Sequence, residues 1–264
     1  MPEPSSLQAV PVPRNEVLLR AQGVSRSFGG LKAVDGVSLE VRRGTVHAVI
    51  GTNGAGKSTL INVLCGEIPA SEGSVELLGR DVSRWSQPRR AQAGLGRSYQ
   101  RNTIYGAFTV FENCRLSAQA RRQRPWDWLS AASRCEFSGA AARRALEKAG
   151  LAAQADREAG TLSHGQKRQL EIAMCLATAP RVLVLDEPLA GMGAEESERM
   201  LALLEGLKAE HAILLVEHDM DAVFRVSDEI TVMVNGRVIA SGAPEEIRNS
   251  PEVQEAYLGD EAVH

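Results

Sequence analysis

The stretch Gly51-Thr-Asn-Gly-Ala-Gly-Lys-Ser-Thr59 decides the fold of this chain. It follows residues 46–50, a continuous apolar run whose length and β-branched content predict a buried strand. It opens a helix that starts near Lys57, carries apolar residues on one face and stops at Gly66. A glycine-rich turn between a strand and a helix is the context in which this motif binds phosphate groups. This context favours a phosphate-binding loop over a glycine-rich turn that binds no ligand.

Each residue type in this phosphate loop has a physical role. Glycines let the backbone amides wrap around phosphate oxygens, and the helix N-terminus adds partial positive charge. Lys57 is expected to reach the β- and γ-phosphates of ATP, and the Ser58 hydroxyl is expected to coordinate Mg²⁺. The residues predicted to contact the nucleotide here are Gly51, Thr52, Asn53, Gly54, Ala55, Gly56, Lys57, Ser58 and Thr59.

Two carboxylates follow a second apolar strand, residues 182–185. Ligands of open α/β sheets bind at the carboxyl ends of strands. Asp186 is therefore predicted to hold Mg²⁺, and Glu187 is predicted to act as general base on the attacking water. An acidic pair at this place could instead cap a helix. The phosphate loop in the same chain favours the metal and base roles.

The third motif is Leu162-Ser-His-Gly-Gln166, which runs into a helical pattern over residues 167–177. A hydroxyl, a flexible glycine and free amides at a helix start form an anion site, although Ser163 could also be only a helix cap. The motif resembles the signature motif of ABC ATPases, which in that family also lies shortly before the acidic motif. On this resemblance Ser163, Gly165 and Gln166 are expected to bind ATP.

The resemblance to ABC ATPases covers residues 17–258 and implies roles for three more residues. Gln100 matches the glutamine that senses the γ-phosphate and Mg²⁺, so it is expected among the catalytic and the metal-binding residues. His218 matches the switch histidine that contacts the γ-phosphate. Phe28 takes the place of the aromatic residue that stacks on adenine. Taken singly, each would be an ordinary surface or core residue, but the order and spacing of the motifs favour the site.

Two positions depart from the family pattern. His164 stands where the signature motif usually has a glycine, and residues 189–194 lack the aspartate that is common after the acidic motif. In the family two chains enclose two ATP molecules, and communication between these two ATP sites is the property that the departures concern.

The expected fold class is α/β, a P-loop NTPase of ABC type. Residues 17–24, 37–41 and 74–78 alternate like strands of an antiparallel β subdomain, and residues 46–50, 182–185 and 213–216 are typical of a buried, mostly parallel core sheet. Asn235-Gly236 predicts a tight hairpin turn. The expected domains are a flexible tail over residues 1–14 and an ATPase domain over 15–264, with an α-helical subdomain inserted at roughly 88–178.

Composition limits the class of protein. The 264 residues are 44% hydrophobic and 24% charged, with a net charge of −3, which gives no reason to expect nucleic acid as a partner. No apolar stretch approaches the about 20 residues that cross a bilayer. Cys65, Cys114, Cys135 and Cys175 lie far apart without metal-ligand spacing, which predicts reduced thiols in a cytoplasmic protein.

The chain most closely resembles the longer ATPase subunit of branched-chain amino acid importers, on residues 118–141, 190–192, 216–220 and 247–259. This implies a peripheral protein on the cytoplasmic face of the inner membrane that works with ATP and Mg²⁺. Its expected partners are two transmembrane permease subunits, a second ATPase subunit and, indirectly, an extracytoplasmic substrate-binding protein. An importer for urea or other amides and a soluble iron–sulfur assembly ATPase are the alternatives.

Overall fold

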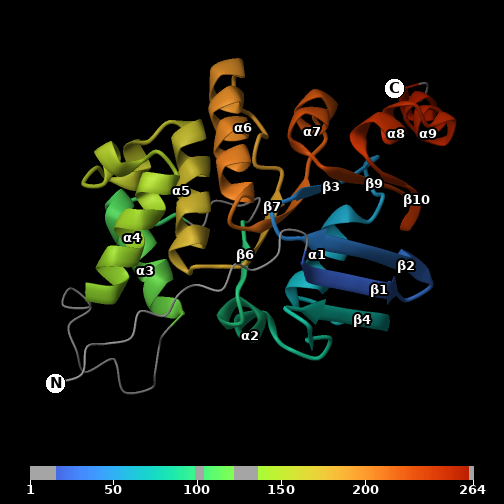
Figure 1. Cartoon of the computed structure of the whole chain (residues 1–264), viewed down its shortest axis with the longest axis horizontal. Helices are drawn as coiled ribbons and strands as arrows, with labels where there is room; N and C mark the ends of the chain where they lie inside the picture. Colours follow the sequence, from blue (N-terminus) through green and yellow to red (C-terminus); the bar gives the residue numbers. More distant parts are fainter. Residues whose placement is uncertain (1–15, 99–103, 122–135, 262–264) are drawn as a thin grey trace.

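The computed structural model describes residues 16–98, 104–121 and 136–261. It contains two sheets, with a group of helices at the end of the molecule away from the antiparallel sheet (Figure 1). Among the described residues, no helix is both long enough and apolar enough to cross a membrane. The predicted tail, residues 1–14, lies outside these ranges.

The antiparallel sheet has the order β2-β1-β4-β5. Both long strands of this sheet extend beyond the predicted ranges, because register shifts, for example between Ala21 and Val24, interrupt the alternation that indicated them. Its strands are β1 (Val17–Phe28), β2 (Leu31–Arg42), β4 (Glu72–Leu77) and β5 (Arg80–Asp81).

The core sheet has the order β10-β9-β3-β8-β7-β6, and its pairs are parallel except β9 with β10. β3, β7 and β8 are buried along their whole length, and each fully buried aliphatic side chain there stabilises the fold by about 1.5–3 kcal/mol. The strands are β3 (Val46–Gly51), β6 (Leu95–Arg97), β7 (Val182–Asp186), β8 (Ala212–Val216), β9 (Glu229–Val234) and β10 (Arg237–Gly242).

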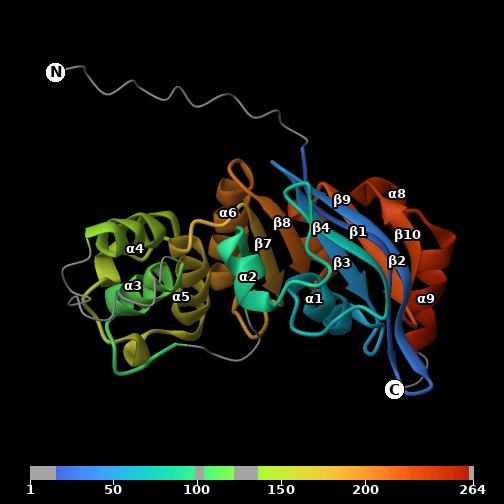
Figure 2. The same cartoon turned by 90° about the horizontal axis from the view of Figure 1, so that it is seen from below.

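The parallel register brings three chain segments to one edge of the core sheet. Val216 pairs with Val49 of β3 and with Asp186 of β7, so the three strands end at nearly the same level. Figure 2 shows β3, β8 and β7 side by side. The loops that follow β3, β7 and β8 therefore meet, which is the arrangement that the sequence predicts for the nucleotide site.

The hairpin between β9 and β10 is as predicted and supports the phosphate loop. Asn235 and Gly236 both have positive φ, 49° and 81°, which a type I′ turn requires. The Gly236 N–H donates to the Ala55 carbonyl at 3.0 Å, and the Gly236 carbonyl accepts from Asp35 N–H at 2.8 Å. The turn thus joins the phosphate loop to the antiparallel sheet.

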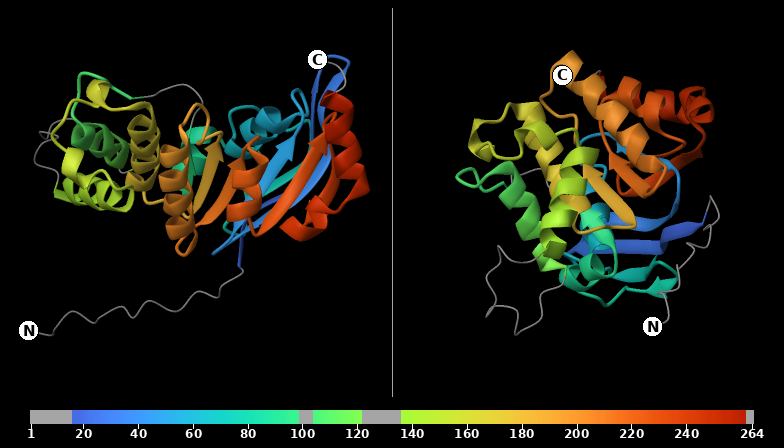
Figure 3. Two further views of the ribbon diagram at one scale, coloured as in Figure 1. Left: turned by 90° about the horizontal axis from the view of Figure 1, so that it is seen from above. Right: turned by 60° about the vertical axis from the view of Figure 1, so that its left-hand side comes forward.

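Five of the described helices form groups at the two ends of the molecule. α3, α4 and α5 pack on one another, with α5 also against β6, and α8 and α9 lie at the opposite end beside β10 (Figure 3). α3 to α5 fall within the predicted helical subdomain, whose boundaries remain a prediction. The helices are α1 (Lys57–Cys65), α2 (Gln87–Gln92), α3 (Val110–Ala120), α4 (Glu136–Lys148), α5 (His164–Ala177), α6 (Ala194–Lys208), α7 (Met220–Val226), α8 (Pro244–Arg248) and α9 (Pro251–Glu261), with short 3-10 turns η3 (Ala152–Gln154) and η4 (Ala159–Thr161).

Arg90 fixes α2 against the C-terminal end of α1. Its side chain is fully buried, and its guanidinium donates to the carbonyls of Val63 and Leu64 at 2.8 and 2.6 Å. Further bonds reach the carbonyls of Ser83 and Trp85, both at 3.2 Å. One planar side chain therefore satisfies carbonyls that the end of α1 leaves without partners within the helix.

Three of the four cysteines lie in described ranges, and all three are free thiols. Burial raises the pKa of Cys65 and of Cys175 to about 12, so both thiols stay protonated and unreactive. Cys135 lies outside the described residues.

Candidate ATP-binding site

The phosphate loop needs glycine at two positions. At Gly51 a Cβ would lie 2.1 Å from the Met233 carbonyl oxygen, and at Gly56 it would lie 2.2 Å from the Ala33 carbonyl oxygen. Gly56 also has φ of 96° and begins α1 as its N-cap. Backbone from β9 and β2 therefore packs against the outside of the loop and fixes its curvature, and the first amides of α1 have no partner within the helix.

Lys57 folds back over the loop. Its Nζ donates to the Gly51 carbonyl at 2.5 Å and to the Thr52 carbonyl at 3.0 Å. Burial lowers the pKa of Lys57, while the nearby charges of Glu187 and Asp186 raise it. The ammonium is thus held at the loop by two carbonyls, where phosphate oxygens can take their place.

Asp186 has the burial and the free oxygen that a magnesium ligand needs. It is 3% exposed, and burial raises the pKa of its carboxyl, with Arg97 opposing that rise. Its Oδ1 is buried without a hydrogen-bond partner among the described residues. A carboxylate oxygen of this kind, with the Ser58 hydroxyl at the start of α1, fits a hard cation that takes its remaining ligands from phosphate and water.

An ion-pair chain that the sequence reasoning missed lies behind Asp186. Arg97 Nη2 is 3.6 Å from Asp186 Oδ2, and Arg97 Nη1 is 3.0 Å from Glu67 Oε1. Glu67 follows α1 and Arg97 ends β6, so no local pattern could have linked them. The guanidinium of Arg97 thus balances the charge of the buried Asp186 carboxylate when no metal ion is bound.

Glu187 and His218 lie close together at the edge of the core sheet, in the loops after β7 and β8. Glu187 Oε1 lies 4.0 Å from His218 Nδ1, and the His218 side chain is 64% exposed. The Glu187 backbone has φ of 49°, and its N–H donates to the Val216 carbonyl at 2.8 Å. A carboxylate and an imidazole that face open space at the sheet edge can act on a water and a phosphate.

The signature motif forms the cap of α5. Ser163 Oγ accepts from the Gln166 N–H at 3.2 Å, and Gln166 Oε1 accepts from the Ser163 N–H at 3.1 Å. Ser163 is therefore the N-cap of α5, the alternative role that the sequence left open for it. The Ser163 hydroxyl donates to Glu196 Oε1 at 3.0 Å, a contact that the sequence reasoning also missed.

The two departures from the family pattern lie beside each other. A Cβ at Gly191 would lie 3.4 Å from the His164 ring, and a Cβ at Gly165 would lie 2.5 Å from Glu196 Cδ. The loop after Glu187 and the start of α6 therefore pack directly on the signature motif.

Phe28 lies at the end of β1, in the hairpin whose second strand contacts the phosphate loop through Ala33. Its ring is 47% exposed, and the Arg26 guanidinium lies 4.6 Å from the ring centroid. An exposed aromatic ring of this kind suits stacking on a base. Gln100, the remaining predicted site residue, lies outside the described residues.

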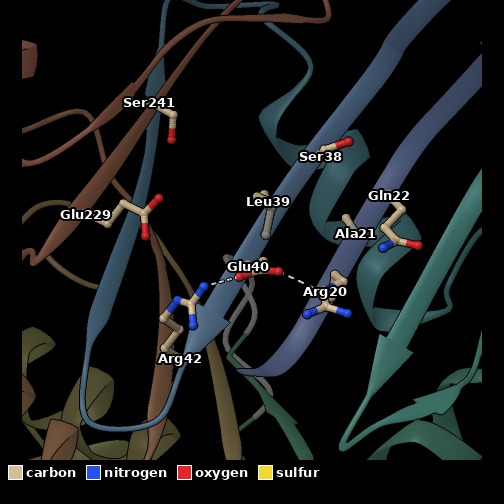
Figure 4. Close-up of a pocket in the computed structure, with 9 residues that line it drawn as sticks. All are labelled: Arg20, Ala21, Gln22, Ser38, Leu39, Glu40, Arg42, Glu229 and Ser241. Atoms are coloured by element: carbon tan, nitrogen blue, oxygen red, sulfur yellow. Dashed lines mark hydrogen bonds and ion pairs between the residues drawn. The ribbon is translucent and has the colours of Figure 1, made fainter. Parts of the chain in front are cut away.

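A cavity of about 400 Å³ lies elsewhere, between the antiparallel sheet and β9 and β10 (Figure 4). Glu40 pairs there with Arg42 and, at 2.8 Å, with Arg20. None of the residues predicted to bind nucleotide lines it. Its lining residues are Arg20, Ala21, Gln22, Ser38, Leu39, Glu40, Arg42, Glu229 and Ser241.

Comparison with known proteins agrees with this geometry. Residues 34–190 match the ABC transporter family model, and residues 237–263 match the model of the branched-chain amino acid ATP-binding cassette transporter. The chain is 39% identical to the high-affinity branched-chain amino acid transport ATP-binding protein BraF of Pseudomonas aeruginosa, over 92% of this chain and 98% of that protein. It is 37% identical to the corresponding LivG protein of Escherichia coli, over 93% of this chain and 99% of that protein.

A solved structure is similar over the same length. The crystal structure of a nucleotide-free ATP-binding cassette from an ABC transporter is 34% identical, with a TM-score of 0.82, and the match covers 92% of this chain and 99% of that one.

Proposed function

The chain belongs to the ABC transporter ATP-binding proteins and hydrolyses ATP, and on that premise we propose that it powers the uptake of branched-chain amino acids. One observation carries the proposal. The likeness to BraF and LivG runs through nearly the whole chain, including the C-terminal segment 237–263 that matches a model specific to branched-chain amino acid transporters.

The reaction divides among the residues at the sheet edge. Lys57 exchanges its bonds to the loop carbonyls for bonds to the β- and γ-phosphates, and the loop amides hold the phosphate oxygens. Glu187 accepts a proton from the attacking water, and His218 donates to the γ-phosphate. Asp186, Ser58 and Gln100 are the residues that would hold Mg²⁺, which would neutralise negative charge on the phosphates. The ring of Phe28 holds the adenine.

The signature motif acts on a second nucleotide. Within the described residues, the side chains of Ser163 and Gln166 bond to each other's backbone, and the Ser163 hydroxyl also bonds to Glu196; these bonds do not reach the phosphate loop of their own chain. A partner ATPase subunit brings its own ATP to this motif, so that two nucleotides lie between two chains. ATP then favours the closed pair, and hydrolysis lets the pair open.

The pair of ATPase subunits works from the cytoplasmic face of the membrane on two permease subunits. A substrate-binding protein delivers the amino acid to these permeases from outside. This part rests on the similarity to transport ATP-binding proteins. In the permeases, closing and opening of the pair drive alternating access.

The test is a mild-detergent pull-down of the tagged full chain from its native cells, with mass spectrometry of the retained proteins. Two multi-spanning permeases and a second ATPase are expected. The recovered complex, reconstituted in vesicles with its binding protein, should import leucine, isoleucine or valine upon ATP addition. Import of urea or another amide alone would reassign the substrate. Recovery of soluble scaffold proteins without permeases would reject the transport function.

A further inference from the structure

Glu217 is a buried carboxylate without a task in the mechanism above. It follows β8 directly, its side chain is 1% exposed, and burial raises the pKa of its carboxyl. Among the described residues, no lysine or arginine pairs with it, and its nearest basic group is the His218 ring, with Nδ1 3.8 Å from Oε2. Burying a carboxylate is costly unless hydrogen bonds compensate it, so its partners show what holds it there.

The two oxygens of Glu217 bind two different loops. Oε1 accepts from the Leu189 N–H at 2.7 Å, and Oε2 accepts from the His218 N–H at 3.2 Å. Leu189 stands two residues after Glu187, and the intervening Pro188 has no N–H to give. Glu217 therefore ties the loop of the general base to the loop of the switch histidine.

The loop that Glu217 holds is strained at Glu187. A φ of 49° is unfavourable for a residue with a side chain, and such a conformation persists only when its surroundings fix it. The Glu187 N–H is held by the Val216 carbonyl at 2.8 Å, and the Leu189 N–H is held by Glu217. Val216, the last residue of β8, and Glu217, which follows it, thus hold the loop on both sides of Pro188.

We propose that Glu217 is a positioning residue of the ATPase reaction, which sets the separation between the Glu187 carboxylate and the His218 ring. The inference rests on the proposed roles of Glu187 and His218. The bonds of Glu217 reach neither residues 51–59 nor Asp186, so its task concerns the chemical step and not the affinity for ATP. A carboxylate suits the task because it accepts from two N–H groups, whereas an amide would turn an NH₂ toward one of them.

The test compares Glu217→Gln and Glu217→Asp with Glu171→Gln in the full chain. Glu171 is also buried, at 4% exposure, and pairs with Arg168, three residues earlier in α5, at 3.0 Å. Steady-state hydrolysis, binding of a non-hydrolysable ATP analogue and thermal melting are measured for each. Both Glu217 variants should lower kcat by about tenfold or more, because small misplacements of reacting groups are that costly, and should leave KM and analogue affinity within about threefold. Glu171→Gln should keep its kcat.

A melting temperature lowered with a normal kcat per folded molecule would overturn the inference, since Glu217 would then only satisfy two buried amides. An equal fall of kcat in Glu171→Gln would also overturn it. If Glu217→Gln does not fold, Glu217→Asp carries the same comparison. Combining Glu217→Gln with His218→Ala should lower kcat by less than the product of the single effects.

Glu187→Gln separates this inference from the site itself. Lost turnover in Glu187→Gln with normal kcat in both Glu217 variants rejects the role of Glu217 alone. Normal turnover in Glu187→Gln rejects the proposed base, and the role of Glu217 with it.

Discussion

The Ser163 hydroxyl donates a hydrogen bond to the Glu196 carboxylate at 3.0 Å. The carboxylate also lies against Gly165, at the start of α5, where helix amides attract negative charge. Glu196 thereby occupies part of the site in which the signature motif is expected to receive the γ-phosphate of a partner chain. An internal anion and the incoming phosphate would repel each other at that place.

The variant Glu196→Gln is expected to favour ATP-driven dimers. Removing one negative charge near the γ-phosphate is worth about 1 kcal/mol at a partly solvated site, so half-maximal dimer formation should need roughly fivefold less ATP. Light scattering of the Glu187→Gln background at increasing ATP measures this. Glu195→Gln is the matched control, because Glu195 is the adjacent carboxylate and is 92% exposed. Unchanged or weaker dimers in Glu196→Gln would show that the contact supports the interface.

Glu187→Gln is expected to bind ATP and to hydrolyse it slowly. Loss of a general base costs roughly 10²–10⁴-fold in rate, while the phosphate loop and Asp186 keep their contacts. Phosphate release and nucleotide binding are measured on the same preparation. Glu198→Gln, an exposed carboxylate of α6 paired with Arg225, should keep normal turnover. Near-normal hydrolysis by Glu187→Gln would remove Glu187 from the catalytic role.

Arg97→Gln is expected to destabilise the nucleotide-free chain and to make the stability of the fold depend more on bound Mg·ATP. Breaking a buried pair costs about 3–5 kcal/mol, because the Asp186 carboxyl stays buried without its partner. The rise of the melting temperature upon Mg·ATP addition should therefore exceed that of the unmodified chain. Arg20→Gln is the control, since its pairs with Glu40 and Glu76 are one-third exposed and worth at most about 1 kcal/mol. Equal melting curves for Arg97→Gln and the unmodified chain would contradict the proposed counter-charge.

Arg90→Lys is expected to lower the free energy of unfolding by about 2–4 kcal/mol, because a lysine cannot supply the planar fork that reaches four carbonyls. Urea unfolding measures the change. Arg89→Lys alters the neighbouring exposed arginine, which lies over the Trp85 ring at 4.0 Å, and should cost less than about 1 kcal/mol. A similar cost at both positions would mean that the carbonyl contacts of Arg90 contribute little.

The sequence predicts the elements of the site better than its side-chain contacts. Strand, glycine turn and helix follow one another locally at Gly51 and Lys57, and parallel strands must end at one edge, so the meeting of Lys57, Asp186, Glu187 and His218 could be predicted. β6 was missed because three residues carry no measurable alternation.

The contacts Arg97 to Glu67, Glu196 to Ser163 and Glu217 to Leu189 join residues about 30 positions apart. They depend on how loops pack in three dimensions, which no local period records. One sequence feature could have pointed to Glu217: it is an acidic residue directly before His218, at the end of an apolar strand.

The turn at Asn235 and Gly236 gives the last part of the chain a direct mechanical connection to the nucleotide. One glycine bonds both to the phosphate loop and to β2, and the strand that leaves it, β10, carries α8 and α9 on its far end. A displacement of these two helices would therefore meet the backbone of the phosphate loop after a single hairpin.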